Sequence, residues 1–117
     1  MSDDRPSTDS KKVSDPSDEP LPDLEPVMVV MSFRTEQAAT LVDILARYVV
    51  LSRGQPGCRN IDLTASMTEP GRFVIVEKWD STEDQRTHFD SDEMVSMAQA
   101  AVPLLSAEPD IDLFEGV

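Results

Sequence analysis

The sequence has little of several residue types from which common functional sites are built, and each shortage excludes a class of protein. The 117 residues include one cysteine, Cys58, and one histidine, His88. A lone cysteine forms no disulfide within the chain, so nothing requires an oxidising compartment. One cysteine and one histidine cannot form a zinc site, and the carboxylates lack the spacing of a calcium loop, so we expect no metal.

Glycine and basic residues are scarce as well. None of the four glycines belongs to a glycine-rich loop that follows a strand, so a nucleotide cofactor held by such a loop is unsupported. The 10 Lys and Arg residues face 23 Asp and Glu residues, and the formal net charge is −13. Because this charge repels phosphate groups and anionic lipids, we expect neither nucleic acid nor a membrane surface as a partner.

Long apolar runs are lacking, and their absence favours a cytoplasmic protein. No run approaches the length of a membrane span. The first residues also lack the basic and then apolar order of a secretory signal.

Residues 1–26 differ in composition from the rest of the chain. They hold five of the nine prolines and no aromatic residue, and their acidic residues outnumber their basic ones. Such a segment cannot bury enough apolar area to offset its conformational entropy, so we expect a disordered acidic tail. A solubilising leader is favoured over a recognition tail. The remaining residues, 27–117, are predicted to form one domain.

The first part of this domain is predicted to be a strand followed by a helix. Residues 27–33 are mostly apolar and rich in β-branched side chains, which is typical of a strand covered on both faces. Apolar residues then recur three and four positions apart from Ala38 to Ser52, and this spacing predicts a helix of about four turns. Thr35 is its expected N-cap, and Gly54 is a natural stop.

The middle of the domain is predicted to be a β-hairpin. Residues 58–67 alternate in polarity, with Cys58 and Asn60 on the same side, and residues 73–79 form the returning strand. Gly71 follows a proline in the connection, which is the type II turn pattern, where glycine supplies the positive φ.

Two helical segments and a last strand follow. Ser81 is expected to cap a helix over residues 82–89. A second capping signal at residues 90–93 precedes another apolar stripe, and Pro103 ends or kinks that helix. Residues 111–115 alternate again and are predicted to be a strand.

The order strand, helix, strand, strand, helical pair, strand predicts an α+β fold. It is the ferredoxin-like βαββαβ arrangement, an antiparallel sheet with helices on one face. The other face still carries apolar residues, including Val74 and Val76, and this predicts a partner surface. A homodimer through the two sheet faces is the expected solution.

Four residues are candidates for chemistry, and each has an ordinary structural alternative. His88 has an unperturbed pKa near 6.5 and could exchange a proton near neutrality, or it only interacts with the negative end of its helix dipole. Trp79 either shapes a pocket or fills the core. Glu77, on the same strand face as Trp79, either lines a pocket or pairs with a cation in solvent. Asn60 either hydrogen-bonds a ligand carbonyl or is satisfied by backbone.

Four motifs are similar to those of the antibiotic biosynthesis monooxygenase family. They are Pro56-Gly57-Cys58, the hairpin over residues 69–74, Glu77-Lys78-Trp79, and His88-Phe89 before Ser91. The resemblance covers residues 27–117 and leaves the tail outside.

This resemblance implies a dimeric α+β barrel, in which two ferredoxin-like subunits pack their sheets together. It implies that O2 oxygenates an aromatic small molecule, a quinol or phenol, without flavin, haem or metal, because the substrate anion itself reacts with oxygen. The pocket would lie between sheet and helices. By the same resemblance His88 is the proton acceptor or anion stabiliser, Trp79 shapes the pocket, and Asn60 donates to a substrate oxygen.

A haem-degrading branch shares the implied fold but not the residues. Its asparagine, tryptophan and histidine positions correspond here to Ser32, His88 and Ala98. All three depart from the pattern, so haem degradation of that type is not expected.

A non-catalytic dimeric module, which binds a small molecule or regulates, is the alternative function. Aromatic residues make up 5% of the sequence, which is low for a pocket that holds a polycyclic substrate. Methionines either supply adaptable apolar walls in their place or only fill the core. The four considered are Met31, Met67, Met94 and Met97.

Overall fold

The structure, a computed structural model, describes residues 25–117. The tail predicted over residues 1–26 lies almost wholly outside the described residues and stays a prediction. In chain order the elements are β1 (Val27–Arg34), α1 (Ala38–Ser52), β2 (Cys58–Ala65), β3 (Arg72–Trp79), α2 (Thr82–Phe89), α3 (Asp92–Ala101), the 3-10 helix η2 (Val102–Leu104) and β4 (Asp110–Glu115). Within residues 25–117, no helix combines the length and the apolar character that crossing a membrane requires.

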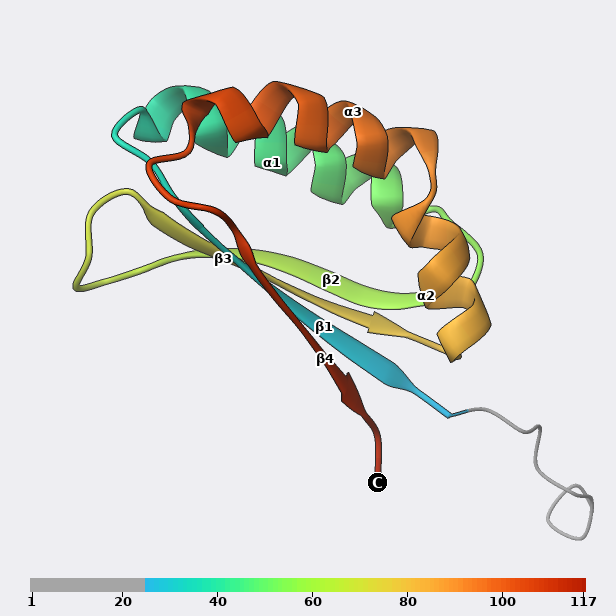
Figure 1. Cartoon of the computed structure of the whole chain (residues 1–117). Coiled ribbons are helices and arrows are strands. Elements are labelled where there is room, and N and C mark those ends of the chain that lie inside the picture. Colours follow the sequence, from blue (N-terminus) through green and yellow to red (C-terminus); the bar gives the residue numbers. More distant parts are fainter. Residues whose placement is uncertain (1–24) are drawn as a thin grey trace, which may run out of the picture.

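The strands form one antiparallel sheet with the order β2-β3-β1-β4. Figure 1 shows α1 and α3 lying together over one face of this sheet, with α2 beside the end of β3. The element order and the one-sided helical layer confirm the predicted α+β, ferredoxin-like fold.

The helices α2 and α3 begin where the sequence places their caps. The Ser81 hydroxyl accepts a hydrogen bond from the backbone N–H of Asp84, and the Ser91 hydroxyl accepts one from that of Met94. The helix α3 gives way to η2, which contains Pro103, because a proline has no N–H to continue the α-helical ladder.

The helix α1 begins later than a Thr35 cap predicts. Its N-cap is Gln37, which makes no side-chain capping bond. The Thr35 hydroxyl accepts from the backbone N–H of Gln37 at 2.9 Å and donates to the carbonyl of Leu104 at 2.7 Å. The predicted N-cap is therefore wrong. The Thr35 side chain instead connects the segment before α1 to η2.

The strand β2 contains a bulge between Cys58 and Asn60. The extra residue places Cys58 opposite Trp79 on the helix-covered face, whereas Asn60 pairs with Lys78 on the other face. The prediction that Cys58 and Asn60 share a face is therefore wrong, because strict alternation fails at a bulge.

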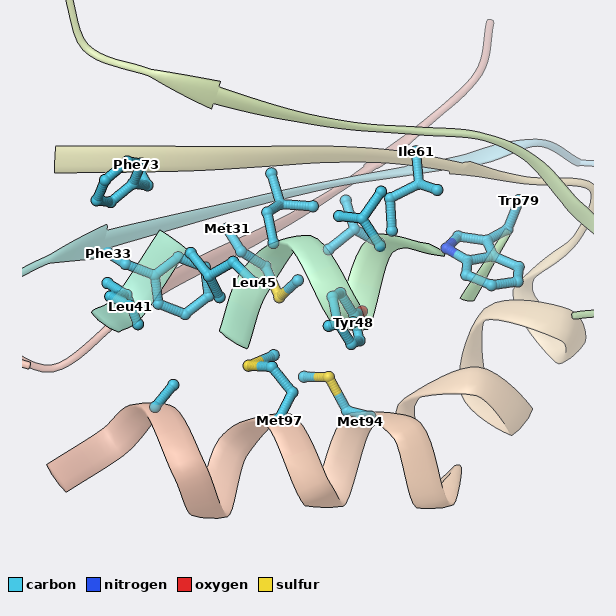
Figure 2. Close-up of a cluster of buried hydrophobic side chains, with 14 of the residues drawn as sticks. Met31, Phe33, Leu41, Leu45, Tyr48, Ile61, Phe73, Trp79, Met94 and Met97 are labelled. Atoms are coloured by element: carbon cyan, nitrogen blue, oxygen red, sulfur yellow. The ribbon is translucent and has the colours of Figure 1, made fainter. Parts of the chain in front are cut away.

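The core lies between the sheet and the helical layer, and Figure 2 shows Met94 and Met97 of α3 pointing into it. Its largest apolar members with almost no exposed surface are Met31, Leu41, Leu45, Ile61, Ile75 and Trp79. Burying each such side chain contributes about 1.5–3 kcal/mol. Among the four methionines considered above, Met67 is 99% exposed and belongs neither to the core nor to any wall, while the other three are buried.

Within residues 25–117, no helix covers the opposite face of the sheet (Figure 1). We call it the open sheet face. Its central apolar residues, all half-buried, are Met28 and Val30 on β1 and Val74 and Val76 on β3. Asp62 and Asp112 flank this stripe from the edge strands. By the described residues of a single chain, β1 is thus covered on one face only, and not on both as its sequence predicts.

The hairpin turn between β2 and β3 requires a glycine. Gly71 has φ +78°, as the turn pattern predicts, and a Cβ there would overlap the carbonyl oxygen of Thr35. We predict that Gly71→Ala lowers the free energy of unfolding by about 2–4 kcal/mol, measured by urea denaturation.

Gly54→Ala is the matched control for this substitution. Gly54 has no positive φ, and no atom lies within 4 Å of the position that its Cβ would take. Its replacement should change the free energy of unfolding by less than about 0.5 kcal/mol. Similar losses in the two variants would contradict the account of the turn.

Candidate functional site

Four side chains from three elements meet at one end of the core. Period two on β3 places Glu77 and Trp79 on the helix-covered face, next to each other along the strand. Tyr48 reaches them from the buried stripe of α1, and His88 reaches them from the last turn of α2. Their exposed fractions are 0% for Trp79, 2% for Glu77 and Tyr48, and 3% for His88, so water has little access to any of them.

The Glu77 carboxylate is hydrogen-bonded on both oxygens. The Tyr48 hydroxyl is hydrogen-bonded to Oε2 at 2.5 Å, and the indole Nε1–H of Trp79 donates to Oε1 at 3.0 Å. A buried carboxylate without such partners would cost several kcal/mol, because it would keep its charge in a low-dielectric interior. These two hydrogen bonds explain how this end of the core tolerates an acid.

The His88 ring is held on both nitrogens. Its Nε2 lies 2.6 Å from the Tyr48 hydroxyl, and its Nδ1 lies 2.5 Å from Oε1 of Gln55. The Gln55 amide in turn donates from Nε2 to Oε1 of Glu93 at 2.6 Å. These contacts form one continuous hydrogen-bonded chain from the buried Glu77 to Glu93 in the first turn of α3.

Ring stacking fixes the remaining freedom of the histidine. The indole of Trp79 and the imidazole of His88 have centroids 4.4 Å apart and planes inclined by 25°. Stacked aromatic pairs of this kind contribute about 0.5–1.5 kcal/mol beyond the area that they bury. The imidazole is therefore oriented by one flat surface and two hydrogen bonds.

Burial shifts the titration of this cluster toward uncharged forms. Burial lowers the pKa of His88 to about 4, although the negative charge of Glu93 acts in the opposite direction. Burial raises the pKa of Glu77 above its ordinary range, and the hydrogen bonds from Tyr48 and Trp79 offset part of that rise. Burial, together with the Glu77 charge, also raises the pKa of Tyr48, so its phenol keeps its proton near neutral pH.

The single thiol, Cys58, is not activated as a nucleophile. Burial and the negative charge of Glu77 raise the pKa of Cys58. A thiol with a raised pKa carries little thiolate at neutral pH. Among residues 25–117, no three His, Cys, Asp or Glu side chains are grouped so that they could hold a metal ion.

A groove of about 360 Å³ runs between α1 and α3 and reaches the cluster at Tyr48. Its lining consists of Ile44, Arg47, Tyr48 and Leu51 from α1 and Asp92, Glu93, Ser96, Met97 and Ala100 from α3. The volume lies within the range of small-molecule sites. Trp79 and His88 line neither this groove nor a smaller cavity of about 60 Å³ beneath α3.

The structure brings together two of the three predicted catalytic residues. Trp79 and His88 are in contact, and Glu77 lies with them. Asn60 is on the open sheet face, is exposed, and donates to Oδ2 of Asp62 at 3.0 Å. In this chain Asn60 is therefore separated from the cluster by the thickness of the sheet.

Three members of the hydrogen-bonded chain were missed from the sequence. Tyr48 had a usable signal, because the only tyrosine of the chain lies on the buried stripe of a helix and its hydroxyl needs a partner there. Gln55 and Glu93 carried none. They are an ordinary turn residue and an ordinary first-turn acid, and only the packing of α1, α2 and α3 brings them to His88.

Comparison with known families and structures agrees with this fold. The family model described as antibiotic biosynthesis monooxygenase matches residues 26–100. That match spans more than half of the chain, and the chain belongs to this family. Among curated protein sequences no match is found.

Solved structures share the fold at low sequence identity. Rv0793 from Mycobacterium tuberculosis has a TM-score of 0.74 and 22% identity, and the match covers 79% of this chain and 91% of that one. SnoaB from Streptomyces nogalater, a cofactor-independent oxygenase solved as a point mutant, has a TM-score of 0.69 and 21% identity over 76% of this chain and 90% of its own. Identities this low establish the fold alone.

Tyr48→Phe tests the energetic role of the hydroxyl that links Glu77 to His88. The variant keeps the ring but leaves Oε2 of Glu77 and Nε2 of His88 without their shared partner. We expect a loss of about 1–3 kcal/mol in the free energy of unfolding. Urea denaturation followed by the fluorescence of Trp79, the only tryptophan, measures it.

A double-mutant cycle provides the control. In a Glu77→Leu background no buried carboxylate remains to be satisfied, so Tyr48→Phe should cost at least about 1 kcal/mol less than in the native protein. An equal cost in both backgrounds would show that the hydroxyl does not act through Glu77.

Proposed function

We propose that this protein is a cofactor-independent monooxygenase that oxidises a quinol-like or phenolic small molecule with O2. Membership of the antibiotic biosynthesis monooxygenase family supports the reaction class. SnoaB, a cofactor-independent oxygenase of the same fold, supports it further. The observation that carries the proposal is the groove between α1 and α3, because its lining includes Tyr48, which is hydrogen-bonded to both Glu77 and His88.

The proposed reaction needs a proton acceptor and no external reductant. Removing a phenolic proton makes the ring electron-rich enough to reduce O2. A quinol and O2 then give a hydroxyquinone and water, so one oxygen atom enters the ring, the other leaves as water, and the quinol supplies the electrons. His88 is neutral at neutral pH and accepts the proton through Tyr48, while Trp79 holds the imidazole in place.

The alternative proposal is a non-catalytic module that binds a small molecule. One observation favours it: His88 and Trp79 are almost fully buried, and both nitrogens of the imidazole are already hydrogen-bonded within the protein. A cluster satisfied in this way is also what a purely structural polar core requires. In that case the groove would hold a ligand without any reaction.

Oxygen consumption separates the two proposals. The native protein, free of added metal and flavin, should consume O2 with at least one member of a panel of quinols and naphthols. We predict that His88→Ala lowers kcat by at least tenfold, because a positioned acid–base group typically contributes about 10²–10⁴-fold. Circular dichroism verifies that the variant is folded.

A groove-filling variant tests where the substrate binds. Ala100→Trp places an indole in the groove and should lower kcat/KM by at least tenfold, whereas Gln99→Trp, at an exposed neighbouring position outside the lining, should leave it unchanged. If calorimetry finds binding that Ala100→Trp abolishes, and no compound of the panel supports O2 consumption, the binding module is the better description.

The protein is also proposed to act as a cytoplasmic homodimer that pairs its open sheet faces. The central stripe of Met28, Val30, Val74 and Val76 is apolar, and no helix of the described part of the chain, residues 25–117, covers it. Val76→Asp places a charge in its middle and should shift the native protein from dimer to monomer in sedimentation velocity. Val95→Asp, at an exposed apolar position of α3, is the control and should leave the dimer intact. A native protein that sediments as a monomer at micromolar concentration would overturn this proposal.

A further inference from the structure

The orientation of the Gln55 amide is determined by its neighbours. The amino group of Gln55 faces Glu93 and donates from Nε2 to Oε1 of that residue at 2.6 Å. The carbonyl Oε1 of Gln55 then faces Nδ1 of His88 at 2.5 Å, and a carbonyl can only accept. Nδ1 of His88 must therefore carry a hydrogen in every arrangement that satisfies all the hydrogen bonds from Glu77 to Glu93.

The Tyr48 hydroxyl has one hydrogen and two short contacts, to Oε2 of Glu77 and to Nε2 of His88. With Nδ1–H fixed, two arrangements satisfy both contacts. In the first, a protonated Glu77 donates to the tyrosine oxygen, and the hydroxyl donates to a bare Nε2. In the second, the hydroxyl donates to an ionised Glu77, and a protonated imidazole donates from Nε2–H to the tyrosine oxygen.

From this geometry we propose that Glu77 and His88 share one proton, which the Tyr48 hydroxyl passes between them, and that Glu93 acts through Gln55 as the positioning residue that fixes the imidazole. The step is balanced. The O–H bond of Glu77 breaks as a new O–H bond forms on Tyr48, while the former hydroxyl proton of Tyr48 forms the N–H bond on Nε2. Glu77 becomes a carboxylate, His88 becomes an imidazolium, and Tyr48 is unchanged.

The surroundings favour the uncharged arrangement as the resting one. Oε1 of Glu77 accepts from Trp79, which leaves Oε2 as the oxygen that carries the proton toward Tyr48. Two titratable groups act on the pair directly, Tyr48 from α1 on Glu77 and Glu93 from α3 on His88, and Cys58 from β2 acts on Tyr48. Burial raises the pKa of Glu77 and lowers that of His88, in agreement with a neutral acid beside a neutral imidazole.

This inference deepens the proposed function and rests on it for its catalytic meaning. Tyr48 and Glu93 line the groove and are also members of the hydrogen-bonded chain. A phenol in the groove would give its proton to the Tyr48 oxygen while the tyrosine proton moves to Nε2 of His88. The substrate anion would then lie close to an imidazolium, which stabilises it.

The position of the imidazole proton is directly measurable, because His88 is the only histidine of the chain. Selective 15N-histidine labelling gives one ring whose long-range 1H–15N spectrum reports the tautomer. We expect a protonated Nδ1 and an unprotonated Nε2 at pH 7. Glu93→Gln lets the Gln55 amide turn over and should yield a mixture of tautomers. Asp92→Asn, the adjacent acid without a bond to Gln55, should leave the tautomer of His88 unchanged. A neutral Nε2–H tautomer in the native protein would refute the proposal.

The number of protons that the pair holds is a second, independent test. An unfolded Glu loses its proton above about pH 4.3, whereas the folded pair keeps one. At Glu77 the folded state thus holds a proton that the unfolded state loses above about pH 4.3, so the stabilisation from this residue is fully present below about pH 4.3 and is lost as pH rises toward the folded pKa of Glu77. Unfolded His88 takes up a proton below about pH 6.5 both in the native protein and in a Glu77→Gln variant, so its contribution cancels when the two are compared. Glu77→Gln mimics the protonated acid and cannot lose a proton.

The ratio of the folding constants of the native protein and Glu77→Gln should therefore fall by up to about tenfold per pH unit above pH 5, until the pH reaches the folded pKa of Glu77. A ratio independent of pH would show that Glu77 is ionised beside a neutral His88, and the shared proton would be excluded. Neither this test nor the tautomer test depends on turnover. If the protein passes both tests but consumes no O2, the shared-proton proposal stands and the oxygenase proposal fails.

Discussion

A carboxyl group buried at the end of β3 is the constraint on which this part of the molecule depends. Glu77 is 2% exposed and has Ile75 and Trp79 as its neighbours on the strand face. An acid at such a position must be neutralised, hydrogen-bonded, or both. Tyr48, Trp79 and, through the tyrosine, His88 meet this demand, so helices α1 and α2 are tied to the sheet at the same point.

This arrangement makes the four side chains of the cluster depend on one another for their contacts. The same hydroxyl that satisfies Glu77 also contacts His88, and the same indole that donates to Glu77 stacks on the imidazole. Removing any one of these groups leaves another buried polar atom without a partner. A loss of activity in a variant of this cluster is therefore interpretable only when its folding is measured alongside.

The sequence predicted most of the fold because its signals are local. Period two on residues 73–79 placed Glu77 and Trp79 on one face, and Ser81 located the start of α2. The prediction from sequence failed where tertiary contacts override local patterns. The bulge beside Cys58 places this residue on the opposite face of the sheet from Asn60. The hydroxyl of Thr35 bonds to the carbonyl of Leu104, and Thr35 is not the cap of α1. The partners Gln55 and Glu93 follow from helix packing alone, which no spacing encodes.

The positions of the groove and of the open sheet face make the two proposals of substrate binding and dimerisation compatible. The groove is lined only by residues of α1 and α3, and these helices lie on the face of the sheet opposite the stripe of Val30 and Val76. Pairing of sheets would therefore leave the groove open to solvent and would require no residue of a partner to complete it. Because Tyr48 and Glu93 belong both to the groove and to the buried chain, proton exchange with a bound phenol would take place within one subunit.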